Sequence, residues 1–312
     1  MKKNLKKILV LFVAIFLLTG CTKVLKDGKN AVIYENNSIK ITLYENILCQ
    51  PETKGLVKEY NKYKKKVDIS KLPKCDNFKV KDSKYEGLWE NLLVKPLAWL
   101  IVRANKLIKN YGITIVLLGI LIRLILAPFS IKTIKQQENM KKMQPELDRL
   151  NKKYENKNDQ ESQQKKSMEM MQLYKKYKIN PVSSCLFALI QIPLIMAFYE
   201  AVNRVPVIFE GKLCGLVLGT TPMKAMAGGH WAYIIIVLLI AITTFISFFM
   251  NKNATPSQGG MNPNVMPIMM TGMITFMALN LPVALSLYWI ASTLFTIVQN
   301  LVNILIKKRK AE

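Results

Sequence analysis

The sequence predicts an all-α polytopic membrane protein. Of its 312 residues, 51% are hydrophobic and 21% are charged, and the formal net charge is +25. The two properties are segregated into long apolar runs and lysine-rich stretches, a pattern typical of chains that cross a bilayer several times. Five runs are long enough to span a membrane: residues 111–130, 183–199, 231–250, 265–281 and 282–306.

Residues 1–20 have the pattern of a lipoprotein-type signal peptide. Four lysines precede an apolar run, residues 8–18, which is too short to span a bilayer comfortably. The run ends in Leu18-Thr19-Gly20-Cys21, which resembles a bacterial lipobox. We therefore expect Cys21 to carry a lipid anchor of the palmitate type on the outer leaflet. An uncleaved signal anchor with an incidental cysteine is the alternative.

Residues 21–85 form the predicted extracytoplasmic, lipidated segment. Alternating residues predict a β-hairpin, with strands over 31–34 and 39–44, and a charged stretch over 54–66 favours a helix. Cys49 and Cys75 are candidates for a disulfide, which their spacing does not compel. We see no chemistry in this segment. After Pro96 the apolar positions recur at helical spacing between basic residues, so residues 86–110 predict an amphipathic helix lying in the membrane interface.

The polar insert between the first two spans, residues 131–181, predicts an antiparallel helical hairpin. Two apolar stripes at helical spacing flank a turn at residues 155–159. The signal peptide places residue 22 outside, so an odd number of spans places this hairpin and the basic tail, residues 307–312, in the cytoplasm. The lysine and arginine density of the hairpin and tail agrees with this orientation.

Arg123 is the only charged residue in the apolar stretch from Thr114 to Ser130. At mid-span an arginine costs about 2.5 to 3.5 kcal/mol, so it should face protein or water. Snorkelling toward the cytoplasmic interface past Pro128 is the alternative. Other spans also carry polar groups that favour a shared hydrated cavity, although isolated interhelical hydrogen bonds would explain them too. These groups are Gln191, Ser286, Tyr288, Trp289, Ser292, Thr293, Thr296 and Gln299.

Four dissimilar stretches occur in a specific order along residues 86–306. They read LLGILIRLILAPF, MQPELDRLNKKY, LYKKYKINPVSSCLFALIQIPLIMAFYEAV and LPVALSLYWIASTLFTIVQN. Together they resemble the YidC-type membrane protein insertases, and the lipobox with five spans resembles the Gram-positive subtype. The resemblance implies an insertase core over residues 111–306, with a hydrophilic groove open to the cytoplasm and to lipid but closed on the outside. By position the groove would contain Arg123, Gln191, Tyr288 and Trp289, while Gly119 departs from members that have a hydroxyl residue there.

The resemblance also implies partners and a location. Nascent membrane proteins would enter the groove and leave sideways into lipid, with the chaperone acting alone or beside the Sec translocon. The hairpin would make first contact with the client. The cationic residues Lys307, Lys308, Arg309 and Lys310 would contact the ribosome or anionic lipid, although a solvated charge run is an equal reading. We expect a bacterial cell membrane protein with no cofactor and no DNA partner.

Enzyme functions fit the sequence poorly. His230 is the only histidine, which excludes histidine-based triads within the chain and zinc sites with two histidines. An anion transporter would use Arg123 as a substrate ligand, but internal repeats and paired broken spans are absent from the sequence. A scaffold lipoprotein would leave Arg123 and the hairpin unexplained. Methionines at 266, 269, 270, 273 and 277 share one helical face, which suits either a slide for clients or ordinary packing.

Overall fold

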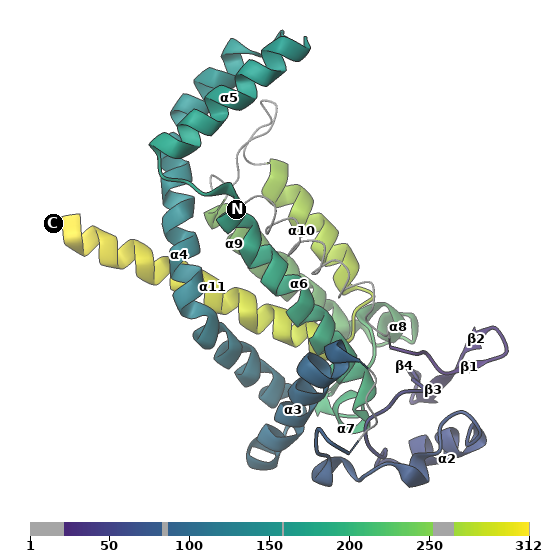
Figure 1. The fold of residues 1–312 in the computed structure, drawn as a ribbon. Helices are drawn as coiled ribbons and strands as arrows, with labels where there is room; N and C mark the ends of the chain where they lie inside the picture. Colours follow the sequence, from purple (N-terminus) through teal and green to yellow (C-terminus); the bar gives the residue numbers. More distant parts are fainter. Residues whose placement is uncertain (1–21, 83–86, 158, 252–264, 312) are drawn as a thin grey trace. The chain divides into compact units, whose positions relative to one another are not determined.

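The computed structural model describes residues 22–82, 87–157, 159–251 and 265–311, and these are mostly helical (Figure 1). The chain divides into two compact units. The first comprises Met1–Leu118, Ile192–Val237 and Ala278–Trp289, and the second comprises Gly119–Gln191, Leu238–Met277 and Ile290–Glu312. The predicted signal peptide and Cys21 lie outside the described residues.

The N-terminal segment, residues 22–82, begins with two small antiparallel hairpins. Its strands are β1 (Lys26–Asp27), β2 (Asn30–Ala31), β3 (Ile33–Asn36) and β4 (Ile39–Thr42). The β3–β4 pair is the hairpin that the alternating pattern predicts, in a register that pairs Ile33 with Thr42. Its turn is shorter than the predicted one at residues 35–38, because β3 continues to Asn36. The two turn residues, Asn37 and Ser38, take positive φ angles of 49° and 60°. That backbone matches the twist of the strands that it joins.

The N-terminal segment shares a hydrophobic core with a distant part of the chain. Buried residues of the strands and of α2 (Lys54–Lys62), among them Ile41 and Tyr60, pack with Phe209 and Val217. The last two belong to the connector, residues 205–230, which lies within the stretch 201–230 that links two predicted spans. The connector contains α7 (Pro206–Phe209), β5 (Lys212–Leu213), β6 (Leu216–Val217) and α8 (Pro222–Ala227). A disulfide joins Cys49 to Cys75, where η2 (Cys75–Asn77) follows η1 (Ile69–Lys71).

A helix with two faces follows the N-terminal segment. A short π-helical turn, η3 (Glu90–Val94), leads directly into α3 (Lys95–Ile108). In α3 the apolar positions Leu97, Ala98, Ile101 and Val102 are buried. The basic side chains of Arg103 and Lys106 are exposed, whereas Lys95 at the start of the helix is buried. An amphipathic helix is therefore present within the predicted range, residues 86–110, although α3 itself covers only Lys95–Ile108 and its place in the membrane interface stays a prediction. Lys109 caps the end of α3: its backbone is left-handed, and its N–H donates a hydrogen bond to the carbonyl of Asn105.

Three helices among the described residues are long and apolar enough to cross a membrane. They are Tyr111–Ile131 in α4 (Tyr111–Lys153), Trp231–Met250 in η4 (Trp231–Tyr233) and α9 (Ile234–Met250), and Val283–Ile306 in α11 (Val283–Ala311). The run at 183–199 lies in α6 (Pro181–Arg204). The run at 265–281 is shorter than expected, because α10 (Val265–Ala278) ends before the turn that leads into α11. The fourteen residues of α10 extend about 21 Å, which is less than the hydrocarbon core of about 30 Å. The prediction of five full crossings is therefore not tested by these helices.

Two of the predicted boundaries, after residue 130 and after residue 306, fall inside continuous helices. The α4 helix continues for 43 residues through Pro128 and Pro145, so the first span and the first arm of the polar insert are one helix. The second arm is α5 (Gln160–Lys176), and the arms share a core of Met143, Leu147 and Leu150, with Leu173 packed against it. Likewise, α11 runs on to Ala311, so the basic tail continues the last helix instead of forming a separate segment.

Candidate functional site

Arg123 lies on α4 among apolar side chains and is bonded to a second helix. Its half-buried side chain donates from Nε to the Oγ of Ser292 on α11, at 2.5 Å. The neighbouring Leu124 and Ile125 are exposed, as expected for side chains that face lipid. An interhelical bond of this kind reduces the cost of placing a guanidinium within an apolar span. This contact favours the interpretation in which the Arg123 side chain faces protein over the one in which it snorkels toward the cytoplasmic interface.

A second polar contact lies seven residues further along both helices. Gln299 donates from Nε2 to the Oγ of Ser130, at 2.9 Å. Because the spacing is seven residues on each helix, α4 and α11 run in the same direction along this contact, as the first and last of an odd number of spans would. We call Arg123, Ser130, Ser292 and Gln299 the polar seam.

A small cavity of about 190 Å³ lies between the middle of α4, the end of α9 and the C-terminal half of α11, within the second unit. Its polar lining includes Gln137, Lys141, Asn251, Asn300 and Asn303. The sequence analysis missed Asn300 and Asn303. The available signal was the spacing of Ser292, Thr296, Gln299 and Asn303 at i, i+4, i+7 and i+11, which places four polar side chains on one face of α11.

The remaining predicted groove residues divide between the two units. Gly119 and Gln191 belong to the second unit with Arg123, whereas Tyr288 and Trp289 belong to the first. Gly119, one turn before Arg123, is buried, and Gln191 on α6 is half-buried. Tyr288 is fully buried and its ring stacks on Phe198, with 4.5 Å between the ring centroids. Trp289 is half-buried. Their place in a groove stays a prediction.

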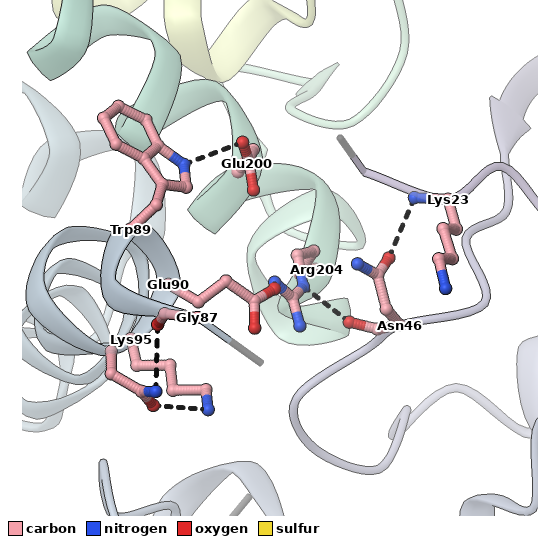
Figure 2. A network of polar contacts seen from close by, with 9 residues as sticks. Lys23, Asn46, Gly87, Trp89, Glu90, Lys95, Glu200 and Arg204 are labelled. Carbon is pink, nitrogen blue, oxygen red and sulfur yellow. Dashed lines mark hydrogen bonds and ion pairs between the residues drawn. The ribbon is translucent and has the colours of Figure 1, made fainter. Parts of the chain in front are cut away.

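A buried polar network in the first unit also escaped the sequence analysis (Figure 2). The guanidinium of Arg204, at the end of α6, forms an ion pair with Glu90 of η3, and both side chains are almost wholly buried. Arg204 Nε also donates to the carbonyl of Asn46 at 2.6 Å, and the carbonyl of Arg204 accepts from the backbone N–H of Leu48 at 2.8 Å. Trp89 donates from Nε1 to Glu200 at 3.0 Å. The network therefore joins η3, α6 and the N-terminal segment.

A third polar contact fastens the connector to the N-terminal segment. The Glu210 carboxylate accepts from the backbone N–H of Thr53, at 3.0 Å, and from the Thr53 hydroxyl, just before α2 begins. Burial raises the pKa of the Glu210 carboxyl above its usual value, and the hydrogen bonds from Thr53 oppose that shift. The connector also contacts β4, because the Thr220 hydroxyl donates to the carbonyl of Lys40 at 2.8 Å.

The fold and the polar seam define a helical membrane protein with a cationic side chain held between two of its membrane helices. Comparison with known proteins identifies the class further. The family model described as the 60Kd inner membrane protein matches residues 103–310, which is about two thirds of the chain. The chain therefore belongs to the 60Kd inner membrane protein family, and it is a bacterial membrane protein.

Several curated relatives carry names that state an activity. Membrane protein insertase YidC 2 of Listeria innocua serovar 6a is 36% identical over 69% of this chain and 71% of its own length. Membrane protein insertase MisCA of Bacillus subtilis strain 168 is 37% identical over 68% and 77%, respectively. Membrane protein insertase YidC 2 of Bacillus anthracis is 39% identical over 69% and 81%.

A solved structure is also similar. It is a crystal structure described as an active YidC insertase with its first transmembrane domain resolved, with a TM-score of 0.51 and 25% sequence identity. The similarity covers 70% of this chain but only 48% of the solved chain, so this chain spans about half the length of that protein.

Proposed function

We propose that this chain is a membrane protein insertase whose client segments pass along the polar seam. The observation that supports this most directly is the Arg123–Ser292 contact, which holds a guanidinium within an apolar span. The insertase names of the curated relatives support the same activity.

The difficulty of insertion lies in the client's short outer tail. Its charges and backbone polar groups must cross a hydrocarbon layer about 30 Å thick, where unsatisfied groups are costly. A groove that opens to the cytoplasm along Gln299, Ser130 and Arg123 shortens that dry distance. The apolar client segment then leaves sideways into lipid and the tail follows.

Arg123 attracts acidic tails in this mechanism. Two opposite unit charges 4 Å apart attract by about 1 kcal/mol in bulk water and by about 4 kcal/mol at an effective dielectric constant of 20. The same carboxylate is therefore held more strongly in the groove than in the cytoplasm. Ser292 holds the guanidinium in place by accepting from Nε.

The finer features of the proposal rest on the sequence. Gln191, Gly119, Tyr288 and Trp289 line the groove with Arg123, the helical hairpin makes first contact with the client, and residues 307–310 contact the ribosome or anionic lipid. The chain is anchored outside through Cys21, has its C-terminus in the cytoplasm, and works alone or beside the Sec translocon. It needs no cofactor and performs no enzymatic reaction.

The test is insertion in cells depleted of their own insertase, with two reporter clients that differ only in an acidic or a neutral outer tail. Arg123→Ala should reduce insertion of the acidic-tail client at least tenfold and affect the neutral one much less, whereas Arg123→Lys should largely retain both. Lys58→Ala is the control, since Lys58 is an exposed cation on α2, outside the seam, the hairpin and the basic tail. Equal insertion of the acidic-tail client by Arg123→Ala and Lys58→Ala would contradict the charge mechanism.

A further inference from the structure

A second cavity lies entirely within the first unit and shares no residue with the polar seam. It has a volume of about 730 Å³ and opens between α3 and the segment that contains η2. Trp99, Arg103 and Lys106 line it from α3, and Asp76, Phe78 and Lys79 line it from the N-terminal segment. The Cys49–Cys75 disulfide holds η2 in place, so this wall of the cavity is fixed.

The two basic side chains that line this cavity from α3 have no side-chain partner among the residues that the structure describes. Within the described part of the chain, neither Arg103 nor Lys106 forms an ion pair or a side-chain hydrogen bond. The carboxylate of Asp82, which also lines the cavity, is already engaged, because it accepts from the backbone N–H of Lys79 at 2.8 Å. The cavity therefore presents two unpaired cations on one helical face, with a carboxylate, Asp76, opposite them.

The same face of α3 carries apolar side chains suited to a bilayer. Trp99, Arg103 and Leu107 follow one another at a spacing of four residues, so they share one face of the helix. Leu107 is 89% exposed and Trp99 is 39% exposed, although α3 buries its other face in the protein. An exposed tryptophan and leucine beside arginine and lysine are typical of helices that lie at headgroup depth.

We propose that this cavity binds the headgroup of an anionic phospholipid in the leaflet that α3 contacts. The lipid phosphate accepts hydrogen bonds from Arg103, whose planar guanidinium can donate two in parallel, and from Lys106. The acyl chains lie along Trp99 and Leu107. Asp76 favours a headgroup whose hydroxyl groups can donate to it, such as the glycerol of phosphatidylglycerol. This site is independent of the proposed function, since it shares no residue with the polar seam.

Native mass spectrometry of the purified full-length protein tests the proposal. The protein is released from nanodiscs that contain equal amounts of phosphatidylglycerol and phosphatidylcholine, and the retained lipid is counted. The wild-type protein should retain phosphatidylglycerol over phosphatidylcholine, and Arg103→Gln/Lys106→Gln should reduce that retention at least tenfold. Lys109→Gln, on the next turn and outside the cavity, should retain lipid like the wild type, as should Arg123→Ala.

Two results would overturn the proposal. One is equal retention of phosphatidylglycerol by Arg103→Gln/Lys106→Gln and by Lys109→Gln, with both variants showing the same thermal unfolding as the wild type. The other is stabilisation against thermal unfolding by soluble glycerol phosphate that matches stabilisation by short-chain phosphatidylglycerol, because the cavity would then bind a free anion and not a bilayer lipid. Both basic residues are exposed, so glutamine at these positions should leave the fold intact.

Discussion

Replacing Glu90 with glutamine would leave the Arg204 guanidinium buried without its carboxylate partner. Both side chains of the pair are at most 3% exposed, so water cannot replace the lost partner. Removing one half of a buried ion pair typically destabilises a protein by about 3 to 5 kcal/mol. Arg204 keeps its hydrogen bond to the carbonyl of Asn46, so we expect the lower part of that range, about 3 kcal/mol.

A double variant separates the cost of the stranded charge from the worth of the pair. Glu90→Leu with Arg204→Met removes both charges and the bond to Asn46, and should cost about 1 kcal/mol, because a neutral replacement of a buried pair is nearly balanced. Glu35→Gln is the surface control, since its ion pair with Lys40 is exposed and 3.8 Å long. It should change stability by less than about 0.5 kcal/mol.

Pulse proteolysis across a urea series, on protein in detergent micelles, measures the free energy of unfolding of each variant. The expected order of loss is Glu90→Gln, then the double variant, then Glu35→Gln. A loss below about 1 kcal/mol for Glu90→Gln would refute the reasoning. So would a double variant at least as unstable as the single one, because the penalty would then not come from an unpaired charge.

Three further predictions concern the N-terminal segment and the polar seam. Burial raises the pKa of the Glu210 carboxyl above its value in the unfolded chain, so the free energy of unfolding should fall as the pH rises from the unfolded pKa through the folded one. Glu210→Gln should flatten this dependence in urea titrations between pH 4 and 8, and an unchanged slope would contradict it. Cys49→Ser with Cys75→Ser opens a bridge between cysteines 26 positions apart, and should cost about 3 to 4 kcal/mol by the chain-entropy relation, measured by pulse proteolysis against the disulfide-bonded wild type. The reduced wild type should show the same loss, and a double variant as stable as the disulfide-bonded protein would contradict it. Gln299→Leu should slow insertion of an acidic-tail client severalfold in the depletion assay, while Val298→Leu, on a different face of α11, should not; equal rates would remove Gln299 from the client path.

Elements that depend on local patterns could be predicted from the sequence. The β3–β4 hairpin, α2, α3 and the two arms of the polar insert all lie where alternation or helical spacing placed them. Element ends were less predictable. The first span was predicted to end at residue 130, but α4 continues through Pro128 and on to Lys153, because tertiary packing can outweigh the loss of one backbone hydrogen bond at a proline.

Contacts between distant residues could not be predicted. The apolar spans made Arg123 conspicuous, but periodicity cannot reveal that its partner is Ser292, 169 positions away, because several polar residues on α11 were equal candidates. Phe209 and Val217 looked like parts of a loop, although they complete the core of the N-terminal segment. Nothing in the local sequence pattern singles out Arg204 or Glu90, and only their pairing explains their burial.

Photocrosslinking next to Arg123 tests the central proposal most directly. A photoreactive residue in place of Ser292 reports on the surroundings of the guanidinium, and one at Ile125, an exposed position two residues beyond Arg123, reports on the lipid-facing side of α4. With a ribosome-stalled client of acidic outer tail, the account predicts a client crosslink from position 292 and mainly lipid crosslinks from position 125. Lipid crosslinks alone from position 292, or equal client crosslinks from both positions, would contradict a client path along the polar seam.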